Sequence, residues 1–372
     1  MKRLLLINSV CGIGSTGRIC ADIAKEYAAK GWDVKIAYGR MATVPADCRP
    51  YAVRIGGPWG VRFHMLLTRV FDWHGTGPCS YFATKKFLKW AEEWKPDIVW
   101  LHNIHGYYLN YPLLFKWIKR HPELEVWWTL HDCWAFTGHC SYFLWTGCPR
   151  WQTGCRDCPE KGEYPKSWLF GNATRNWQIK KEAFGGVEKM TLITPSKWLA
   201  DLTRQSFLKE YPVRVVPNTI DTATFKPTPG DFRVRWGLAG RKIVLGVACP
   251  WDKRKGLDDF LRLRTLLPEQ YVLVLVGLSA RQIARLPKGM LGIRRTNSKQ
   301  ELAEIYSAAD WFFNPSRGES FSLTNLEAAS CGCRVVTYDA GGTPESVAGV
   351  PSAIVLRGVD KSPEGFVRAI GL

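Results

Sequence analysis

In the N-terminal half, short apolar runs alternate with stretches in which apolar and polar positions follow helical periodicity. Residues 4–8 form the first apolar run, and a glycine-rich turn follows at 12–17. Residues 19–30 repeat apolar positions with helical spacing up to Gly31, and residues 34–38 form the next apolar run. A strand, a helix and a second strand in this order make a βαβ unit, which predicts a parallel sheet.

The same rhythm continues along the chain in two series. In the first series we expect strands at 98–102, 126–130, 192–195 and 213–216, and helices at 81–94 and 111–119. In the second series we expect strands at 243–248, 271–276, 292–295, 311–314 and 334–338. Ser298 and Glu301 have the spacing of a capping box and predict a helix that ends near residue 309, and Gly332 closes a later helix. A last helix is expected at about 362–370.

Two such series in 372 residues indicate an α/β protein with two Rossmann-like, doubly wound domains. We place the N-terminal domain at 1–213 and the C-terminal domain at 214–372. Ligands of these sheets bind beyond the carboxyl ends of the strands, so we expect the domains to face each other across a cleft that holds the site. The loop 133–164 breaks the rhythm, because it is rich in Cys, Gly, Pro and Trp and has no period.

The charge of the chain narrows its possible partners. Its 51 Lys and Arg against 33 Asp and Glu give a formal net charge of +18, which attracts nucleotides, phospholipid headgroups or nucleic acid. No helix-turn-helix, RNA-recognition or zinc-finger spacing is present, so nucleic acid is not an expected partner. No apolar run approaches the ~20 residues of a membrane span. The run after Lys2 and Arg3 is too short for a signal peptide, which favours a cytoplasmic protein.

The first candidate motif is Gly12-Ile13-Gly14-Ser15-Thr16-Gly17, which follows a strand and opens a helix. Its glycines let backbone amides approach a phosphate at the helix N-terminus, as in dinucleotide-binding folds. The second strand runs on to Arg40 and has no acidic residue at its end, and an Arg there can accept the 2′-phosphate of NADP. An NADP-dependent oxidoreductase is therefore one interpretation, and a tight turn without a ligand is another.

The second candidate motif places Glu319 and Glu327 at a strand-to-helix junction. Glu319 lies in the loop before the helix, and Glu327 lies two turns into it. The free amides and the positive end of the helix dipole between them suit a diphosphate. We therefore expect Ser320, Phe321 and Ser322 to help bind a nucleotide donor.

With this motif the chain resembles the retaining GT-B glycosyltransferases of family 4 over nearly its whole length. The likeness includes the early glycine-rich loop, residues 216–221, and the Lys-Gly pair at 255–256. It implies that Glu319 faces the donor sugar, that Glu327 holds the nucleotide ribose and that Gly14 lies at the donor site. Residues 129–134 and the Cys-rich loop after them resemble the bacterial capsular and colanic-acid exopolysaccharide glycosyltransferases.

The resemblance also assigns roles to a basic cluster and to a histidine. Lys255, in the sequence Lys253-Arg254-Lys255-Gly256, neutralises the leaving diphosphate. Pro250 stands where the family usually carries an Arg, and we expect Arg254 to supply that charge. His131 follows a predicted strand and contacts the donor sugar, so the expected catalytic residues are Glu319, His131 and Lys255.

Four residues in the irregular loop are cysteines, which are common ligands in structural zinc sites. They are Cys140, Cys148, Cys155 and Cys158, and the last two form a C-x2-C pair. Four thiolates with one such pair match tetrahedral zinc ligation. A cytoplasmic protein does not rely on disulfides, so we expect zinc. Two disulfides or four free thiols in a packed loop are the alternatives.

The partners follow from the resemblance. It implies a retaining hexosyltransferase that uses a UDP- or GDP-sugar, with no cofactor in catalysis. The implied acceptor is a polyprenyl-linked glycan in exopolysaccharide, capsule or O-antigen biosynthesis. Basic and Trp-rich surfaces then place the enzyme on the anionic inner membrane face. A zinc-stabilised glycan-binding protein without catalytic activity is a further alternative.

Overall fold

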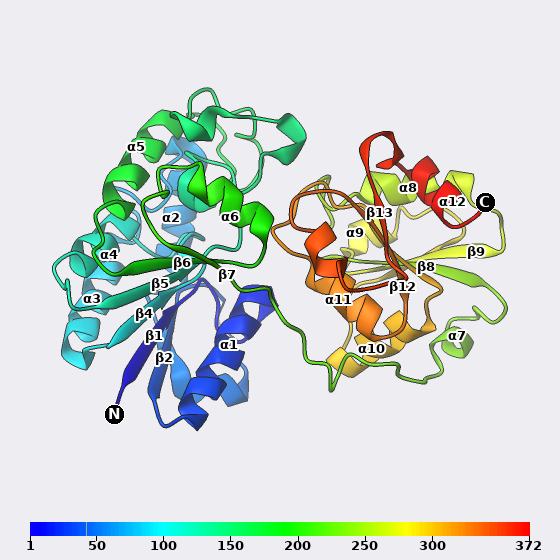
Figure 1. Cartoon of the computed structure of the whole chain (residues 1–372), viewed down its shortest axis with the longest axis horizontal. Helices are drawn as coiled ribbons and strands as arrows, with labels where there is room; N and C mark the ends of the chain where they lie inside the picture. Colours follow the sequence, from blue (N-terminus) through cyan, green and yellow to red (C-terminus); the bar gives the residue numbers. More distant parts are fainter. Residues whose placement is uncertain (42) are drawn as a thin grey trace. The chain divides into compact units, whose positions relative to one another are not determined.

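The computed structural model describes residues 1–41 and 43–372 and forms two compact units, Met1–Val216 and Pro217–Leu372. Each unit is an α/β fold around its own parallel sheet (Figure 1). The domain boundary expected between 213 and 214 would cut through strand β7 (Val213–Val215). That strand pairs with β6 (Met190–Thr194) in the first sheet, so the division falls after Val216 instead.

The first unit contains a seven-stranded sheet in the order β3-β2-β1-β4-β5-β6-β7, and all its strand pairs are parallel. Its other strands are β1 (Arg3–Ile7), β2 (Asp33–Tyr38), β3 (Ala52–Arg54), β4 (Ile98–Leu101) and β5 (Glu125–Thr129). Its α-helices are α1 (Gly14–Ala29), α2 (Pro58–Phe71), α3 (Tyr81–Trp94), α4 (Tyr111–Ile118), α5 (Ala173–Phe184) and α6 (Lys197–Arg204).

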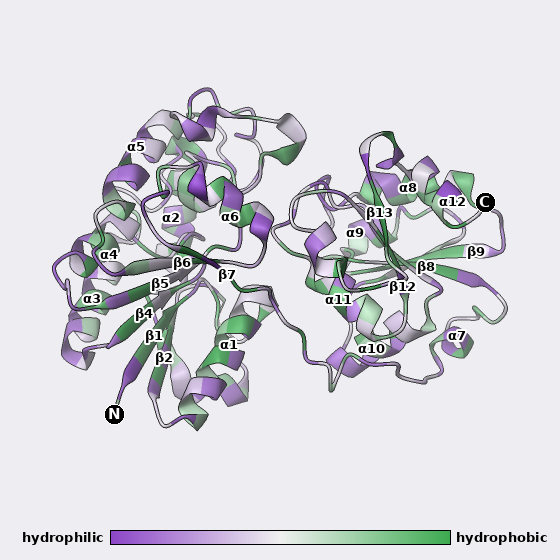
Figure 2. Ribbon diagram, in the orientation of Figure 1, coloured by the Kyte–Doolittle hydropathy of each residue, from purple (hydrophilic) through white to green (hydrophobic). Residues whose placement is uncertain are grey.

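Strand β1 shows why the sheet of the first unit is buried on both faces. Leu4 and Leu6 pack with residues of α1, whereas Leu5 and Ile7 pack with residues of α3, α4 and α5. Successive side chains of a strand point to opposite faces, so each face receives every second residue. A sheet covered on both sides needs strands with apolar residues on both faces, and β1 is accordingly apolar from Leu4 to Ile7 (Figure 2).

The second unit contains a six-stranded parallel sheet in the order β10-β9-β8-β11-β12-β13. Its strands are β8 (Lys242–Val247), β9 (Tyr271–Val276), β10 (Met290–Ile293), β11 (Trp311–Asn314), β12 (Arg334–Tyr338) and β13 (Ile354–Leu356). Its α-helices are α7 (Phe232–Arg235), α8 (Leu257–Leu266), α9 (Ala280–Ile283), α10 (Lys299–Ala308), α11 (Leu323–Ser330) and α12 (Pro363–Ala369).

Helices cover both faces of the second sheet as well. Residues of α10 and α11 pack with Phe312 of β11 on one face, and residues of α8 and α12 pack with Trp311 and Phe313 on the other. Both units thus have the doubly wound architecture that the sequence predicts. No helix in the described part of the chain is long and apolar enough to cross a membrane.

Most expected elements agree with the observed ones, and the differences have local causes. Helix α1 begins at Gly14, so residues 14–17 of the expected turn at 12–17 are already helical. The loop 133–164 contains only three short 3₁₀ turns, at Trp134–Phe136, Leu144–Thr146 and Arg150–Gln152.

The capping box expected at the start of α10 forms only in part. Ser298 accepts a hydrogen bond from the Glu301 amide at 3.0 Å, as expected. The Glu301 carboxylate instead accepts from the amide of Asn297 at 2.6 Å, one residue before the cap.

Candidate active site

In the second unit, two loops meet where adjacent strands end. Strands β8 and β11 pair in parallel, so the loops that leave their carboxyl ends lie side by side. The first of these loops carries Arg254 and Lys255, and the second carries Glu319. This arrangement explains how residues 64 positions apart come into contact.

Lys255 and Glu319 form an ion pair with 2.5 Å between Nζ and Oε1. The side chain of Glu319 is 9% exposed and that of Lys255 is 21% exposed. Burial by itself would raise the pKa of the Glu319 carboxyl, but Lys255 and then Arg254 outweigh it and hold that pKa below its usual value. Glu319 is therefore a charged carboxylate at neutral pH, with a cation against it.

Two glycines fix the backbone around this pair. Gly341 has a φ of +74°, and a Cβ there would lie 2.3 Å from the carbonyl oxygen of Glu319. The neighbouring amide of Gly342 donates to the same oxygen at 2.8 Å. Gly256 has a φ of +73°, and a Cβ there would lie 2.7 Å from Pro315. Larger residues at 256 or 341 would displace the loops that carry Lys255 and Glu319.

Arg254 lies beside the same carboxylate. Its guanidinium donates to the carbonyl oxygen of Gly318 at 2.9 Å, and its own carbonyl accepts from the amide of Arg317 at 2.8 Å. These bonds connect the two loops and place a second cation next to Glu319. Whether Arg254 supplies the charge expected in place of an Arg at 250 stays a prediction.

The residues before α11 have different environments. Ser320 is buried and Phe321 is half-buried. Ser322 is fully buried and caps the helix, because its hydroxyl accepts from the Asn325 amide at 3.4 Å and from the Asn314 side chain at 3.0 Å. The side chain of Ser322 therefore serves as a helix cap. Its contact with a donor stays a prediction.

Glu327 lies on α11 and faces α10. The Tyr306 hydroxyl donates to its Oε2 at 3.0 Å, and Tyr306 is fully buried. Burial raises the pKa of Tyr306 well above its usual value, and the negative Glu327 raises it further, so the hydroxyl keeps its proton. The sequence pattern indicated neither this pair nor the role of Tyr306, since spacing within α10 shows only that the residue faces the core.

In the first unit, Gly14 and its neighbours form the turn between β1 and α1. Gly14 has a φ of +65° and faces open space where a side chain would lie. Gly12 has a φ of +70°, and a Cβ there would lie 2.7 Å from the Cys48 sulfur. The Gly12 amide donates to the Gly17 carbonyl at 3.1 Å. Gly12 is therefore required by packing, whereas Gly14 leaves space near the start of the helix.

His131 is part of a stacked pair of imidazoles at the ends of two adjacent strands. Its Nε2 lies 3.0 Å from Nδ1 of His102, and the ring planes differ by 16°. Burial lowers the pKa of His131 to about 4. His131 is therefore neutral at pH 7, and one of the two rings must donate to the other.

A second polar contact at these strand ends involves His105 and Asp132. Nε2 of His105 lies 3.0 Å from Oδ2 of Asp132, and its Nδ1 lies 3.1 Å from the Tyr164 hydroxyl. Asp132 also accepts from the amide of Trp134 at 2.9 Å. Tyr164 had no signal in the sequence, because it lies 59 residues from His105 in a loop without periodicity.

The four cysteines expected to bind zinc all line one small pocket in the Cys-rich loop. None forms a disulfide. Gly138 donates its amide to the Cys155 sulfur at 3.1 Å. A hydrogen bond from Cys140, together with nearby His139, lowers the pKa of Cys158 to about 7. Among the described residues the four sulfurs do not converge within 4.8 Å of one another, so an ion would have to draw them together.

Two family models match the chain. The model described as Glycosyltransferase Family 4 matches residues 16–224, and the model described as Glycosyl transferases group 1 matches residues 241–371. Together they cover both units and support neither the oxidoreductase nor the non-enzymatic interpretation.

Similar curated proteins match over part of their length. A colanic acid biosynthesis glycosyl transferase, WcaC, of Escherichia coli is 32% identical over 35% of this chain and 32% of its own length. The alpha-galactosylglucosyldiacylglycerol synthase of Streptococcus pneumoniae is 29% identical over 42% of this chain and 45% of its own length. The chain thus spans less than half of the length of these relatives.

Solved structures share the fold across the whole chain. Sucrose-phosphate synthase from Thermosynechococcus elongatus has a TM-score of 0.70 at 17% identity, and it covers 100% of this chain and 89% of its own. Anabaena Alr3699/HepE, in complex with UDP-glucose, has a TM-score of 0.64 at 16% identity over the same shares. WaaG, a glycosyltransferase involved in lipopolysaccharide biosynthesis, has a TM-score of 0.64 at 17% identity, with 99% and 89% covered. The fold of this chain is therefore of the GT-B type. Since one family model alone matches more than half of its residues, the chain belongs to glycosyltransferase family 4.

Proposed function

We propose that this chain transfers a hexosyl group from a nucleoside diphosphate sugar to a lipid-linked glycan, with retention of anomeric configuration. The observation that supports this most directly is the Lys255–Glu319 ion pair, with Arg254 beside it, at the carboxyl ends of β8 and β11. It combines a carboxylate with two cations in the part of such a sheet where nucleotides bind. A solved protein of the same fold is in complex with UDP-glucose, which supports a donor of this class.

The cations suit the departure of a nucleoside diphosphate. In the proposed step, the bond between the anomeric carbon and the phosphate oxygen breaks, and the acceptor oxygen bonds to that carbon on the same face. The acceptor proton passes to the departing diphosphate. Lys255 and Arg254 neutralise the negative charge that develops on this leaving group, and the free amides at the start of α11 add to their effect.

Carboxylates position the two ends of the donor in this proposal. Glu319 accepts hydrogen bonds from the sugar hydroxyls, and Glu327 accepts them from the ribose. His131 of the first unit contacts the sugar as a neutral imidazole, and Gly14 leaves room for a phosphate at the start of α1. The Tyr306 hydroxyl fixes the orientation of the Glu327 carboxylate.

The donor base can be identified by calorimetry with UDP, GDP, ADP, CMP, NADP and NAD. We expect one nucleoside diphosphate to bind, and Glu327→Ala to weaken it about 10- to 100-fold, because hydrogen bonds to a charged group contribute about 1.5–3 kcal/mol. Glu182→Ala, which removes an exposed carboxylate in the first unit, serves as control. Binding of NADP alone, unchanged in Glu327→Ala, would contradict the proposal.

The acceptor side of the proposal rests on an exposed apolar surface of the first unit. This α2 surface consists of Trp59, Phe63 and Leu66 on α2, together with residues 168–170. Trp59 is 77% exposed and Phe63 is 53% exposed. Arg62 and Arg69 lie over Trp59 and Trp168, at 4.8 and 5.0 Å from the ring centroids.

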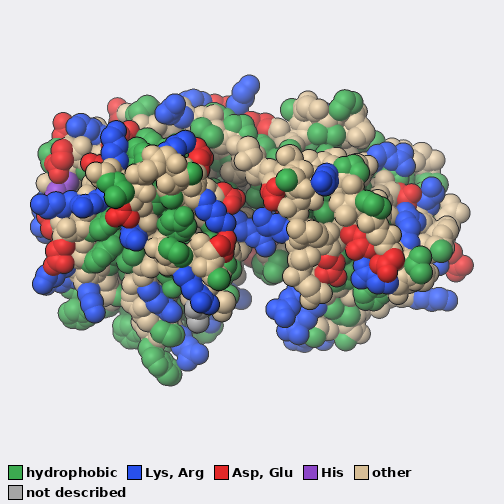
Figure 3. Space-filling view, turned by 90° about the horizontal axis from the view of Figure 1, so that it is seen from below, with side chains coloured by type: hydrophobic (Ala, Val, Ile, Leu, Met, Phe, Trp, Pro, Cys, Tyr) green, Lys and Arg blue, Asp and Glu red, His purple; other side chains and the backbone are tan. Residues whose placement is uncertain are grey.

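Arginine and aromatic side chains together suit the interface of an anionic membrane. Lys and Arg side chains also lie among hydrophobic ones on the face seen in Figure 3. We therefore propose that the α2 surface holds the enzyme on the inner membrane face, where a polyprenyl-linked acceptor is found.

Flotation with vesicles that contain anionic lipid tests this surface. Trp59→Ser/Phe63→Ser should lower the bound fraction by roughly 10-fold or more, because each buried aromatic side chain contributes about 1.5–3 kcal/mol. Val234→Ser/Trp236→Ser removes two exposed apolar side chains of the second unit and should float like the wild type. If the wild type itself stays unbound at moderate salt, the membrane proposal is wrong.

We also propose that Cys140, Cys148, Cys155 and Cys158 bind a structural zinc ion. The four residues line one pocket, and the amide of Gly138 donates to Cys155 as amides do to metal-bound thiolates. Lys180 is fully buried on α5 near Cys155 and Cys140, so its amino group lies beside the sulfurs that would carry the negative charge of a zinc tetrathiolate. The ion would hold the irregular loop against the sheet.

Metal analysis of the purified protein tests the thiolate site. Cys155→Ser should lose one equivalent of zinc and unfold at a lower temperature, because zinc binding contributes directly to folding. Cys249→Ser, at an exposed cysteine outside the loop, should keep its zinc. A mass four hydrogens below that of the reduced chain, with no zinc lost, would instead show two disulfides.

A further inference from the structure

A second cluster of metal-ligating side chains lies in the first unit, apart from the four cysteines and from the proposed catalytic residues. Asp72, His74 and His139 are all buried, and one donor atom from each lies within 4.8 Å of the other two. In the described ranges 1–41 and 43–372 this is the one such group of three. The residues come from the end of α2, the segment after it and the Cys-rich loop.

Both imidazoles of this cluster approach the same carboxylate oxygen. Nδ1 of His139 lies 2.7 Å from Oδ1 of Asp72, and Nε2 of His74 lies 2.6 Å from it. The His139 contact has the geometry of a hydrogen bond, whereas the His74 contact does not. Two imidazole nitrogens thus lie against one carboxylate oxygen, and donor atoms in this arrangement can converge on an ion.

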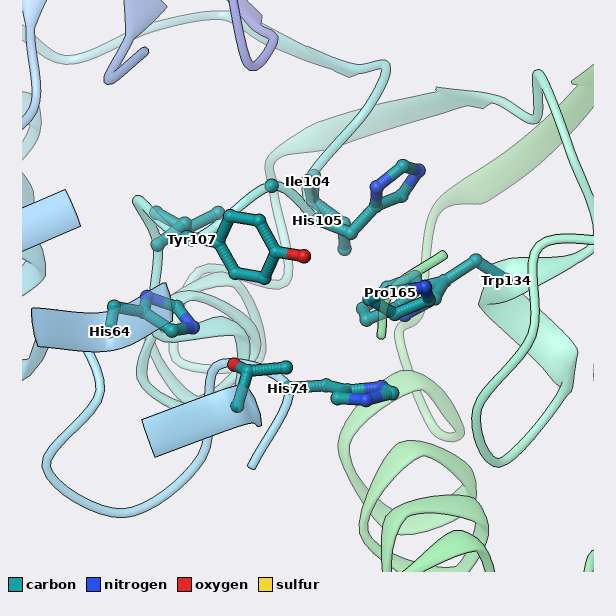
Figure 4. Close-up of a pocket in the computed structure, with 10 residues that line it drawn as sticks. His64, His74, Ile104, His105, Tyr107, Trp134 and Pro165 are labelled. Carbon is teal, nitrogen blue, oxygen red and sulfur yellow. The ribbon is translucent and has the colours of Figure 1, made fainter. Parts of the chain in front are cut away.

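Buried nitrogen atoms without a hydrogen-bond partner concentrate in this region. Among the described residues they include both ring nitrogens of His74, Nε2 of His139 and Nε2 of His64. Native interiors pair nearly all buried polar atoms, and a group of unpaired ones indicates an ion or water between them. His64 and His74 also line one pocket together with Tyr107 and Trp134 (Figure 4).

Asp72 is held in place by backbone and amide groups of the α5 region. The amide of Asn172 donates to its Oδ2 at 2.7 Å, and the Asn176 side chain donates to its carbonyl oxygen at 2.7 Å. The rings of His74 and His139 are 4.9 Å apart. Supporting bonds of this kind orient metal ligands before an ion binds.

We propose that Asp72, His74 and His139 bind a divalent transition-metal ion such as zinc. Two imidazoles and one carboxylate are a common donor set for zinc, with a fourth position left open. The pocket beside His74 provides space at that position for a water molecule or a ligand oxygen. A dication also compensates the cost of a fully buried carboxylate.

The existing spacing requires only a small movement. Donors at about 2.0–2.1 Å from a tetrahedral zinc ion lie about 3.3 Å apart, so the imidazoles, now 2.7 and 2.6 Å from Oδ1, would withdraw from it by about 0.6 and 0.7 Å. The ion would connect the end of α2 to the Cys-rich loop, and Asp72 already connects to α5. This site does not depend on the proposed transferase reaction.

Zinc content and calorimetry of the full chain test the site, after metals have been removed with a chelator. A variant with Cys140, Cys148, Cys155 and Cys158 changed to Ser removes the thiolates and should still bind one equivalent of zinc. Adding His74→Ala should reduce this to none. Adding His64→Ala instead should leave one equivalent, because His64 lines the same pocket but is not a proposed ligand.

If the variant with the four cysteines changed to Ser does not fold, cobalt titration of the wild type tests the same site. Thiolate ligands give cobalt(II) an intense charge-transfer absorption, whereas imidazole and carboxylate ligands do not. We expect one equivalent with that absorption and one without it, and the second should disappear in Asp72→Asn and His74→Ala. A folded serine variant without zinc, or a second equivalent that persists in both of these variants, would overturn the proposal.

Discussion

Glu319→Gln is expected to lower kcat by about 10²- to 10³-fold, the range seen when one preorganised electrostatic contact to a transition state is removed. Gln keeps the shape of the side chain and loses the charge that is paired with Lys255 at 2.5 Å. A neutral amide no longer stabilises the positive charge that develops at the anomeric carbon, and it no longer orients Lys255. The ground-state contacts of the nucleotide are made elsewhere, so its Kd should change by less than about threefold, which is under 1 kcal/mol.

The charge state of Glu319 makes this effect independent of pH near neutrality. Lys255 and Arg254 outweigh the effect of burial and hold the pKa of the carboxyl below its usual value, so it is ionised throughout the neutral range. The ratio of wild-type to variant kcat should therefore be constant between about pH 6 and 8.

Steady-state kinetics with the donor identified by calorimetry provide the measurement. Glu269→Gln changes an exposed carboxylate of the second unit and should leave kcat unaltered. Unchanged turnover in Glu319→Gln would show that the assignment of Glu319 is wrong. A large loss of nucleotide affinity with unchanged kcat would instead place Glu319 at the nucleotide.

Lys180→Ala is expected to lower the free energy of unfolding by about 3–5 kcal/mol at pH 8. Lys180 is fully buried on α5, and its Nζ donates to the carbonyl oxygens of Trp134 and Thr137 at 2.7 and 2.9 Å. It also lies 3.5 Å from the centroid of the Trp134 ring. Alanine removes these contacts, leaves two buried carbonyls unpaired and creates a cavity beneath the Cys-rich loop.

The stability difference between wild type and Lys180→Ala should depend on pH in a definite direction. Burial lowers the pKa of Lys180 from 10.5 to about 7 in the folded chain. Between pH 7 and 10 the unfolded chain therefore holds a proton that the folded chain lacks, so wild-type stability rises with pH in this range. The difference between the two proteins should grow over the same interval.

Denaturant unfolding at several pH values measures both effects. Lys181→Ala, on the exposed face of the same helix, should cost less than about 1 kcal/mol. This account of Lys180 would be contradicted if Lys180→Ala changed the free energy of unfolding only slightly. It would also be contradicted if the difference in free energy from the wild type shrank as pH rises from 7 to 10.

Within the site, sequence and structure contributed in different ways. The motif that contains Glu319 and Glu327 could be found because both residues belong to one strand-to-helix junction. The motif around Lys255 could be found for the same reason. Neither motif predicts that Lys255 contacts Glu319, since this contact depends on β8 and β11 being neighbours in the sheet.

The spacing of residues along the sequence could not predict other features of the site. Ser322 had a suitable position for donor binding, but its hydroxyl is used to cap α11. Tyr306 pairs with Glu327 from a different helix, and Asp72 meets His139 from 67 residues away. Contacts of this kind join segments whose order in the chain carries no information about their distance.

By itself, the sequence determined the alternation of strands and helices, because apolar spacing follows directly from the need to bury each face of a parallel sheet. It also determined the division into two α/β units and the positions of the glycine-rich turn, the two Glu residues and the four cysteines. Only the tertiary structure decided which polar side chains meet: Lys255 with Glu319, Tyr306 with Glu327, and Asp72 with two histidines. The physical reason is that a buried charge or imidazole selects its partner by distance in the folded chain, and strand order and helix packing set that distance.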